Sequence, residues 1–486
     1  MSEFVSCVIL VWILILSGVV EVCAQSWEDD PKLHMTVDMR LRLYRSNRTF
    51  GSYRPRATRL LNMLPGYTSQ AGVQLSAYGG WADRQVEGTG FFRTQKIDGR
   101  WWFVDPDGYL FFGTALNSIR WGSPKDRSVT APPIFESRWS DPQAWAQETV
   151  GFLRTNGFNV VGTWSDPLLL KTEHKRPQVW TTVIYMMYPF GTRYGAKSNE
   201  NNMQFPNQCI PIFDPEFEDF CRARAKEKIT DEMIQDSTLL GYFVDNELPW
   251  REDALSRYLS LEQSDINFQK ALAWVAKEKG RDARAVDIDT LKASLTDDEQ
   301  DKFLRHIARR YFEIVSKVLR NRDPNHLFLG SRLHGQAIRL KPVFEVLGEY
   351  ADVISVNYYH RWTPRTPELE NWSTWSGDKP FVISEWYVKG EDSGYTNTDG
   401  AGGVVKTQVD RGRFYQNFTL GLLESKSCIG WFWHTYRDTK DLPNGSNKGF
   451  LSIRYEPFDD LVEMAREINT QVYPLTSYFD SQSRKN

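Results

Sequence analysis

Eight short apolar runs, separated by longer amphipathic stretches, constrain the fold of this chain more than any other feature. The runs are rich in Leu, Val, Ile, Phe and Tyr, as buried parallel strands are. They span residues 109–116, 158–164, 180–186, 240–246, 327–333, 352–358, 380–385 and 428–434. Helical patterns lie between them, for example at 143–155, 215–236, 300–321 and 457–469. This alternation predicts an α/β protein of the (β/α)8 TIM-barrel type.

The chain length fits one large barrel with additions. A barrel needs about 250 residues before insertions, and this chain has 486. Residues 25–90 show no sustained period and predict an irregular N-terminal extension, whereas 91–475 form the barrel domain and 476–486 a polar C-terminal tail. Turn signals at 98–99 and 105–108 predict a hairpin that feeds the first barrel strand.

Two connections are longer than barrel loops usually are. They cover residues 187–239 and 250–326 and flank the fourth strand, so we expect them to shape a cleft. A polar, Gly-rich segment at 396–403 lacks the spaced carboxylates of a calcium loop and predicts a flexible lid.

The N-terminus resembles a secretory signal. An apolar run at 5–20 precedes the small-residue site Val22-Cys23-Ala24, which predicts cleavage of residues 1–24 and a secreted protein. An uncleaved N-terminal membrane anchor is the alternative. Sequons for N-glycosylation occur at Asn47, Asn371, Asn417 and Asn444.

Three cysteines remain after such cleavage. Cys209 and Cys221 are candidates for a loop disulfide in an oxidising compartment, and Cys428 lies in an apolar run, where a buried thiol is expected.

Composition narrows the classes of partner. The 59 basic and 62 acidic side chains nearly balance, so no nucleic-acid partner is indicated. Aromatic residues reach 14% with 18 Trp, which favours either carbohydrate stacking or a large aromatic core. The histidines show no H-E-x-x-H spacing and no dinucleotide or phosphate fingerprint occurs, so we expect neither a metal nor a cofactor.

Two glutamates stand where apolar strands end. Glu247 closes Gly241-Tyr-Phe-Val-Asp-Asn-Glu247 on strand four, and Glu385 closes Phe381-Val-Ile-Ser-Glu385 on strand seven. Retaining glycosidases use such a pair, one as acid/base and one as nucleophile, about 5–5.5 Å apart. Asn246 is suited to bond a sugar 2-hydroxyl, which makes Glu247 the acid/base and Glu385 the nucleophile. Asp245 is expected to be a buried structural carboxylate.

Three segments carry a family resemblance: 96–108, 241–250 and 355–359. With them the chain resembles the retaining glycoside hydrolases of clan A and is most similar to the β-agarases of glycoside hydrolase family 50, over about residues 90 to 470. Family 50 members usually carry a further N-terminal β-sandwich-like domain, for which residues 25–90 are too short.

The resemblance implies roles for individual residues. It assigns Glu247 as acid/base, Glu385 as nucleophile and Asn246 as a sugar contact. Tyr358 and Tyr359 compete for the tyrosine that bonds the nucleophile, and strand alternation favours Tyr359. Trp433 matches an aromatic platform under the sugar at the cleavage point.

Further strand-end residues are candidates for substrate contact or for support of the site. They are Asn117, Trp164, Arg332, His334, His360 and Trp386.

The expected reaction is retaining hydrolysis of an agarose-like β-galactoside polymer by double displacement. Another β-linked glycan, such as a mannan, a β-glucan or a uronic-acid polymer, and a non-catalytic carbohydrate-binding barrel are the alternatives.

Overall fold

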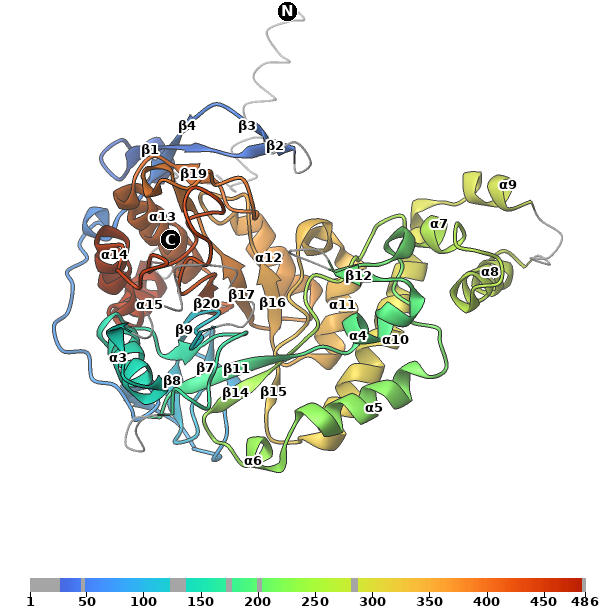
Figure 1. Cartoon of the computed structure of the whole chain (residues 1–486), viewed down its shortest axis with the longest axis horizontal. Helices are drawn as coiled ribbons and strands as arrows, with labels where there is room; N and C mark the ends of the chain where they lie inside the picture. The colour runs from blue at the N-terminus through green and yellow to red at the C-terminus, as the bar shows by residue number, and fades with distance from the viewer. Residues whose placement is uncertain are drawn as a thin grey trace, which may run out of the picture.

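The centre of the molecule is one curled, eight-stranded parallel sheet, seen here in a computed structural model (Figure 1). The structure describes residues 27–44, 49–122, 137–171, 177–198, 203–280 and 287–482. The strand order is β15-β14-β11-β10-β9-β20-β17-β16. The strands are β9 (Gly113–Leu116), β10 (Val160–Val161), β11 (Val179–Ile184), β14 (Leu239–Val244), β15 (Leu327–Phe328), β16 (Ile354–Asn357), β17 (Phe381–Trp386) and β20 (Cys428–Trp433).

The two outermost strands of this sheet, β15 and β16, meet without a continuous ladder. One parallel bridge joins Leu333 to Val356, and the Leu333 N–H donates to the Ser355 carbonyl at 2.9 Å. Gly330, between β15 and this bridge, has φ +82, so the chain leaves the extended conformation there. A Cβ at this position would lie 3.0 Å from the Ser355 hydroxyl, so the close approach also favours glycine. The α/β prediction with eight parallel strands is confirmed. The sheet is TIM-barrel-like, although its ladder does not close.

Two apolar cores form on the two faces of this sheet. Phe243 and Phe432 lie inside the curl, with ring centroids 5.9 Å apart. Trp431 and Trp433 point outward, into the larger core between the sheet and the helices. This alternation decides which residues at the strand ends reach the centre.

Helices surround the sheet, and α7, α8 and α9 project from one side (Figure 1). The α-helices are α3 (Pro142–Thr155), α4 (Met187–Gly191), α5 (Phe217–Lys228), α6 (Asp231–Ile234), α7 (Ala254–Tyr258), α8 (Ile266–Lys279), α9 (Ile288–Ala293), α10 (Asp297–Arg322), α11 (Lys341–Tyr350), α12 (Thr366–Trp375), α13 (Gln408–Glu424), α14 (Asp459–Asn469) and α15 (Val472–Gln482). Short 3-10 turns are η1 (Trp27–Asp29), η2 (Leu61–Met63), η3 (Thr192–Tyr194), η4 (Pro206–Gln208), η6 (Gly335–Arg339) and η7 (Glu391–Ser393).

Local sequence sets the start of the longest helix. Thr296 accepts from the backbone of Glu299, whose side chain bonds back to the Thr296 N–H, which forms a capping box at the start of α10. The two long connections contain α4–α6 and α7–α10, together with the hairpin of β12 (Lys197–Ser198) and β13 (Met203–Gln204).

The N-terminal extension is more regular than expected. It contains β1 (Met35–Arg40), β2 (Arg42–Tyr44), β3 (Thr49–Phe50), β4 (Arg54–Thr58) and β5 (Trp81–Gln85). β1 and β4 join β18 (Lys389–Gly390) and β19 (Val404–Val405) in a separate four-stranded sheet. The expected hairpin is formed by β6 (Arg93–Ile97) and β7 (Arg100–Val104), with β8 (Tyr109–Phe111) beside β7, so run 109–116 splits between β8 and β9.

The C-terminal segment is helical rather than a separate polar tail. α15 runs to Gln482, Phe479 is buried on it, and Asp480 pairs with the buried Arg100 at 2.8 Å. Residues 476–482 therefore belong to the packed domain.

The cysteine pairing is a correction. Cys209, Cys221 and Cys428 are all free and buried, so the disulfide between Cys209 and Cys221 is not formed. Cys221 faces the core from α5, whereas Cys209 follows η4 at the end of a different loop. The buried Cys428 thiol on β20 is confirmed.

The sequons differ in accessibility. Asn371 and Asn444 are exposed, but Asn417 is fully buried in α13, and its amide donates to the Trp362 carbonyl. Asn47 and the predicted signal peptide at 1–24 lie outside the described residues. Within the described part of the chain, no helix has both the length and the apolar character needed to span a bilayer.

Candidate active site

Glu247 lies just after β14, at the carboxyl end of the curled sheet. Its backbone has φ 53, and its N–H donates to the Arg332 carbonyl at 3.3 Å. Its Oε1 accepts from the Asn357 amide at 2.9 Å and lies 3.8 Å from Nδ1 of His334. The side chain keeps 10% exposure, so it is not fully buried.

Glu385 reaches the same region because of a bulge in β17. Ile383 pairs with Trp431 and Trp386 with Trp433, so three steps on β17 oppose two on β20. The extra residue turns both Ser384 and Glu385 toward the centre of the sheet, as bulges near functional sites do.

Both oxygens of Glu385 accept a hydrogen bond from a buried donor. Nη2 of Arg332 donates to Oε1 and the Tyr359 hydroxyl donates to Oε2, each at 2.6 Å. Burial acts to raise the pKa of Glu385, but His434, Arg332 and these bonds outweigh it and leave that pKa below its usual value. Burial also lowers the pKa of His434 to about 4, so its ring is neutral near pH 7.

Asn246 connects the two glutamates. Its Oδ1 accepts from Nε of Arg332 at 2.8 Å and from the Asn357 amide at 3.3 Å. Arg332 bonds Glu385 and Asn357 bonds Glu247, so the two carboxyl groups share one hydrogen-bonded network. Ser384 completes it by donating to Oδ1 of Asn357 at 2.7 Å.

Aromatic side chains line one side of the network. The guanidinium of Arg332 lies 4.6 Å from the ring of the half-buried Trp164, whose indole N–H donates to Tyr185 at 2.8 Å. Tyr185 stacks on Tyr188, and Tyr188 donates to the Asn246 carbonyl. Such flat faces suit the C–H surface of a sugar.

Asp245 has the structural role expected of it. It is fully buried and accepts from the N–H groups of Met186, Met187 and Tyr188 and from the Tyr311 hydroxyl. It thereby fixes the chain after β11 against β14.

Several predicted site residues are brought together here. Asn246, Arg332 and Tyr359 follow β14, β15 and β16 and contact each other or Glu385 directly. His334 lies beside Glu247, and Trp164 lies beside Arg332. The choice of Tyr359 over Tyr358 for the bond to Glu385 is confirmed.

Three aromatic candidates face away from the site. Trp433 is 0% exposed and packs against Tyr415 and Phe450, so it is no sugar platform. Trp386 stacks on Phe418 of α13. Tyr358 bonds Glu368 on α12. All three occupy strand positions that point to the outer core, as alternation and the β17 bulge require.

Two further candidates are also corrected. Asn117 is fully buried, donates to the Ser384 carbonyl and accepts from Thr163, so its amide is occupied within the protein. His360 is exposed and lines a depression with Pro55 and Arg56 of the extension.

Residues that sequence reasoning missed are His434, Asn357 and Ser384. His434 directly follows β20, contacts Trp164 with ring centroids 5.7 Å apart, and has a buried Nδ1 without a hydrogen-bond partner. The inward position of Phe432 on the same strand would have indicated His434 rather than Trp433.

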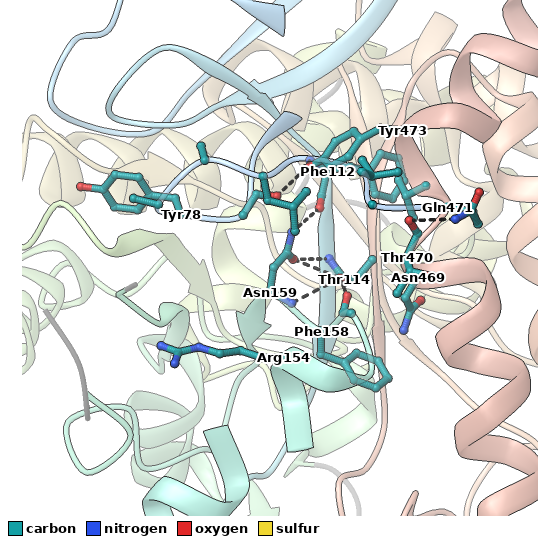
Figure 2. Close-up of a pocket in the computed structure, with 18 of the residues that line it drawn as sticks. Tyr78, Phe112, Thr114, Arg154, Phe158, Asn159, Asn469, Thr470, Gln471 and Tyr473 are labelled. Atoms are coloured by element: carbon teal, nitrogen blue, oxygen red, sulfur yellow. Dashed lines mark hydrogen bonds between the residues drawn. The ribbon is translucent and has the colours of Figure 1, made fainter. Parts of the chain in front are cut away.

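No group of His, Cys, Asp and Glu suited to a metal ion occurs among the described residues. A cavity of about 490 Å³ lies at the opposite edge of the sheet, near the amino ends of β9 to β11 (Figure 2). Several of its polar groups are engaged within the protein; for example, Asn159 accepts from the Thr114 N–H at 2.8 Å and Tyr473 donates to the Gly79 carbonyl at 2.7 Å. Neither Glu247 nor Glu385 lines this cavity, so it is separate from the candidate site.

Two curated relatives of this chain are named β-agarases. The chain is 26% identical to Beta-agarase B of Vibrio sp. (strain JT0107) over 82% of this chain and 50% of that protein. It is 24% identical to Beta-agarase A of the same strain, over 79% of this chain and 46% of that protein. This chain thus spans about half the length of these two relatives.

A solved structure matches over nearly its full length. The crystal structure of BpGH50 has a TM-score of 0.78 and 27% identity, and the match covers 92% of this chain and 96% of that one. No protein-family model matches the chain.

Proposed function

We propose that this chain is a retaining glycoside hydrolase with Glu385 as nucleophile and Glu247 as general acid/base. The bonding of Glu385 carries the proposal, because buried donors on Arg332 and Tyr359 hold both of its oxygens and favour the ionised form. A nucleophilic carboxylate must be ionised and oriented in this way. The proposal treats the sheet as a TIM-type barrel whose chemistry lies at the carboxyl ends of the strands.

In the first step Glu247 donates its proton to the glycosidic oxygen while Glu385 attacks the anomeric carbon. The leaving sugar departs, and a covalent glycosyl ester forms on Glu385. In the second step Glu247 takes a proton from water, which displaces Glu385 and restores the same anomeric configuration. We assign Asn246, which is bonded to Arg332 and Asn357 between the two glutamates, the contact to the sugar 2-hydroxyl.

The proposed substrate is an agarose-like polysaccharide with β-linked galactose. The similarity to two proteins named as β-agarases supports this choice. The aromatic surface of Trp164 and Tyr185 beside the glutamates is consistent with sugar stacking. We also propose that the enzyme is secreted, with an N-terminal membrane anchor as the alternative.

Isosteric variants test the roles of the glutamates. Glu247→Gln should lower kcat by about 10²- to 10⁴-fold, the usual contribution of a general acid, and Glu385→Gln should lose at least as much. Glu349→Gln is the control, because this glutamate pairs with Arg309 at the surface. Full activity in either active-site variant would rule out the assignment.

Azide distinguishes the two roles. With an activated β-glycoside, azide should rescue Glu385→Ala by forming the α-glycosyl azide, and Glu247→Ala by forming the β-glycosyl azide, as resolved by NMR. Agarose, carrageenan, mannan, β-glucan and glycosaminoglycans should be screened in parallel. Hydrolysis of another glycan would change the assigned substrate but leave the proposed mechanism in place. If none of these glycans were hydrolysed, the result would support a carbohydrate-binding protein.

A further inference from the structure

The N-terminal extension pairs with the segment that directly follows the nucleophile strand. β1 runs antiparallel to β19, with Met39 opposite Val405, and β19 runs parallel to β18, with Val404 opposite Lys389. β18 begins three residues after β17 ends. The loop between β18 and β19, residues 391–403, includes the Gly-rich segment for which a flexible lid was expected.

Two basic side chains hold that Gly-rich segment by its backbone. Arg42 of the extension donates from Nη1 to the Thr398 carbonyl and from Nη2 to the Gly400 carbonyl, each at 2.8 Å. Lys389 donates to the Asn397 and Asp399 carbonyls at 2.9 and 3.0 Å. Four successive carbonyls are therefore bonded alternately by the two residues, and the segment is not a free lid.

Lys389 shows how fully the segment is enclosed. Its side chain is 0% exposed, and burial lowers its pKa well below the usual value. Its Nζ lies 5.6 Å from the ring of Phe50, which also belongs to the extension. The extension thus covers the amine that holds the inner side of the segment.

The anchored segment packs closely against Tyr387. The Ala401 N–H donates to the Tyr387 hydroxyl at 2.9 Å. A Cβ at Gly400 would stand 2.0 Å from that hydroxyl, and one at Gly402 would stand 2.5 Å from the ring. Only glycine permits this approach, so the position of the backbone and that of the tyrosine are linked.

Tyr387 contacts the residues that hold the nucleophile. Its ring lies edge-on to Tyr359, with centroids 5.1 Å apart, and 6.1 Å from the ring of His434. Tyr359 donates the hydrogen bond to Oε2 of Glu385.

We propose that Arg42 is a positioning residue for the catalytic centre: by fixing residues 397–401 it fixes Tyr387, and through Tyr387 it fixes Tyr359 against Glu385. The proposal rests on the proposed function only in naming Glu385 as the nucleophile. The extension then completes the active site without touching the substrate.

The test compares Arg42→Met, Arg42→Lys and the control Lys406→Met. Lys406 also links the domain to the extension, through Asp38 at 2.6 Å, but it contacts none of residues 397–401 in any described bond. Arg42→Met should lower kcat by roughly 10- to 100-fold, the effect of a small displacement of a catalytic group. The acid limb of kcat/KM should move to higher pH, because a loosened Tyr359 no longer favours the Glu385 carboxylate. Arg42→Lys should show smaller changes in kcat and in the acid limb than Arg42→Met, and Lys406→Met should change neither kcat nor the acid limb.

Hydrogen exchange supplies a readout that needs no turnover. Arg42→Met should speed exchange of a peptide covering residues 397–403, while Lys406→Met should not. Unchanged exchange in Arg42→Met would overturn the proposal even if the enzyme acted on no glycan tried. Faster exchange with an unchanged pH profile in an active enzyme would overturn it too. Inactivity of the wild type would count against the proposed function alone.

A double variant separates positioning from general destabilisation. Tyr387→Phe removes the hydroxyl that accepts from Ala401. If Arg42 acts through Tyr387, the effects on kcat of Arg42→Met and Tyr387→Phe should combine less than additively. Full additivity would show that Arg42 acts by another route.

Discussion

Nη2 of Arg332 donates to Oε1 of Glu385 at 2.6 Å, and the two side chains are only 0% and 9% exposed. Such a pair stabilises little compared with apolar packing, but removal of one partner leaves a buried charge. Its position therefore indicates a role in holding the carboxylate ionised and oriented.

Arg332→Met should move the acid limb of kcat/KM to higher pH. The arginine is among the groups that keep the pKa of Glu385 low against the effect of burial, so its loss allows that pKa to rise. The free energy of unfolding should fall by about 3–5 kcal/mol above that limb, where Glu385 is charged. Arg309→Met, which breaks the exposed pair with Glu349, should leave the pH profile unchanged. A pH profile unchanged in Arg332→Met would refute this role.

Tyr359→Phe should lower kcat and Tyr358→Phe should lower stability, although the two residues are adjacent. Loss of the Tyr359 hydroxyl removes a bond to a charged group worth about 1.5–3 kcal/mol, so kcat should fall by roughly 10- to 150-fold. Loss of the Tyr358 hydroxyl removes its bond to Glu368 in the outer core and should affect stability but not kcat. Steady-state kinetics and thermal unfolding of both variants check this, and similar kcat losses would contradict it.

Asp245 should make stability depend on pH. Burial raises its pKa to about 6 from 3.8, although four donors face it. The folded protein then keeps the proton up to about pH 6 while the unfolded chain loses it near pH 4. Stability should therefore fall by roughly 3 kcal/mol as pH rises through this window. Urea unfolding from pH 4 to 7 should show that the difference in the free energy of unfolding between the wild type and Asp245→Asn changes within this window. A constant difference would mean that the donors keep Asp245 ionised throughout.

The three described cysteines should be inert in the native protein. Burial raises the pKa of Cys428 to about 12 and raises the pKa values of Cys209 and Cys221 as well. A thiol reagent should label these positions only after denaturation, and a reducing agent should leave the unfolding midpoint unchanged. Mass mapping of labelled peptides identifies the sites, and a Cys209–Cys221 disulfide peptide would contradict the structure.

Accessibility should decide which sequons can carry a glycan. When the chain is made in a eukaryotic secretory pathway, Asn371 or Asn444 should be modified, because both are exposed, whereas the fully buried Asn417 should not. Glycopeptide mass spectrometry checks each site. A glycan on Asn417 would require α13 to leave its present packing.

The sequence predicted the site best where local patterns sufficed. An apolar run that ends in a glutamate located Glu247 and Glu385, and the alternation of Asn357 and Tyr359 selected the correct tyrosine. It failed at β17, where a bulge changed the alternation, and at β20, where the regular alternation was not applied. The bulge in β17 turns Trp386 outward, and the inward position of Phe432 puts His434 rather than Trp433 at the centre.

Long-range pairing accounts for the other differences. β1 has too few apolar residues to be recognised from its own sequence. Its partner β19 is distant in the chain, so the pairing could not be recognised either. The bond between Arg332 and Glu385 likewise joins residues that no sequence spacing relates. Neither the four-stranded sheet nor the hydrogen-bonded network could be derived before the fold was known.

The bonds from Arg42 to the Gly-rich segment also limit when this part of the fold can form. Arg42 and Thr398 are 356 residues apart in the chain, so during synthesis the extension emerges from the ribosome long before its partner exists. Closing so long a loop costs conformational entropy, which slows the formation of such contacts. The bonds from the extension can therefore form only after residues 397–405 have been made, and the surroundings of Glu385 are complete only then.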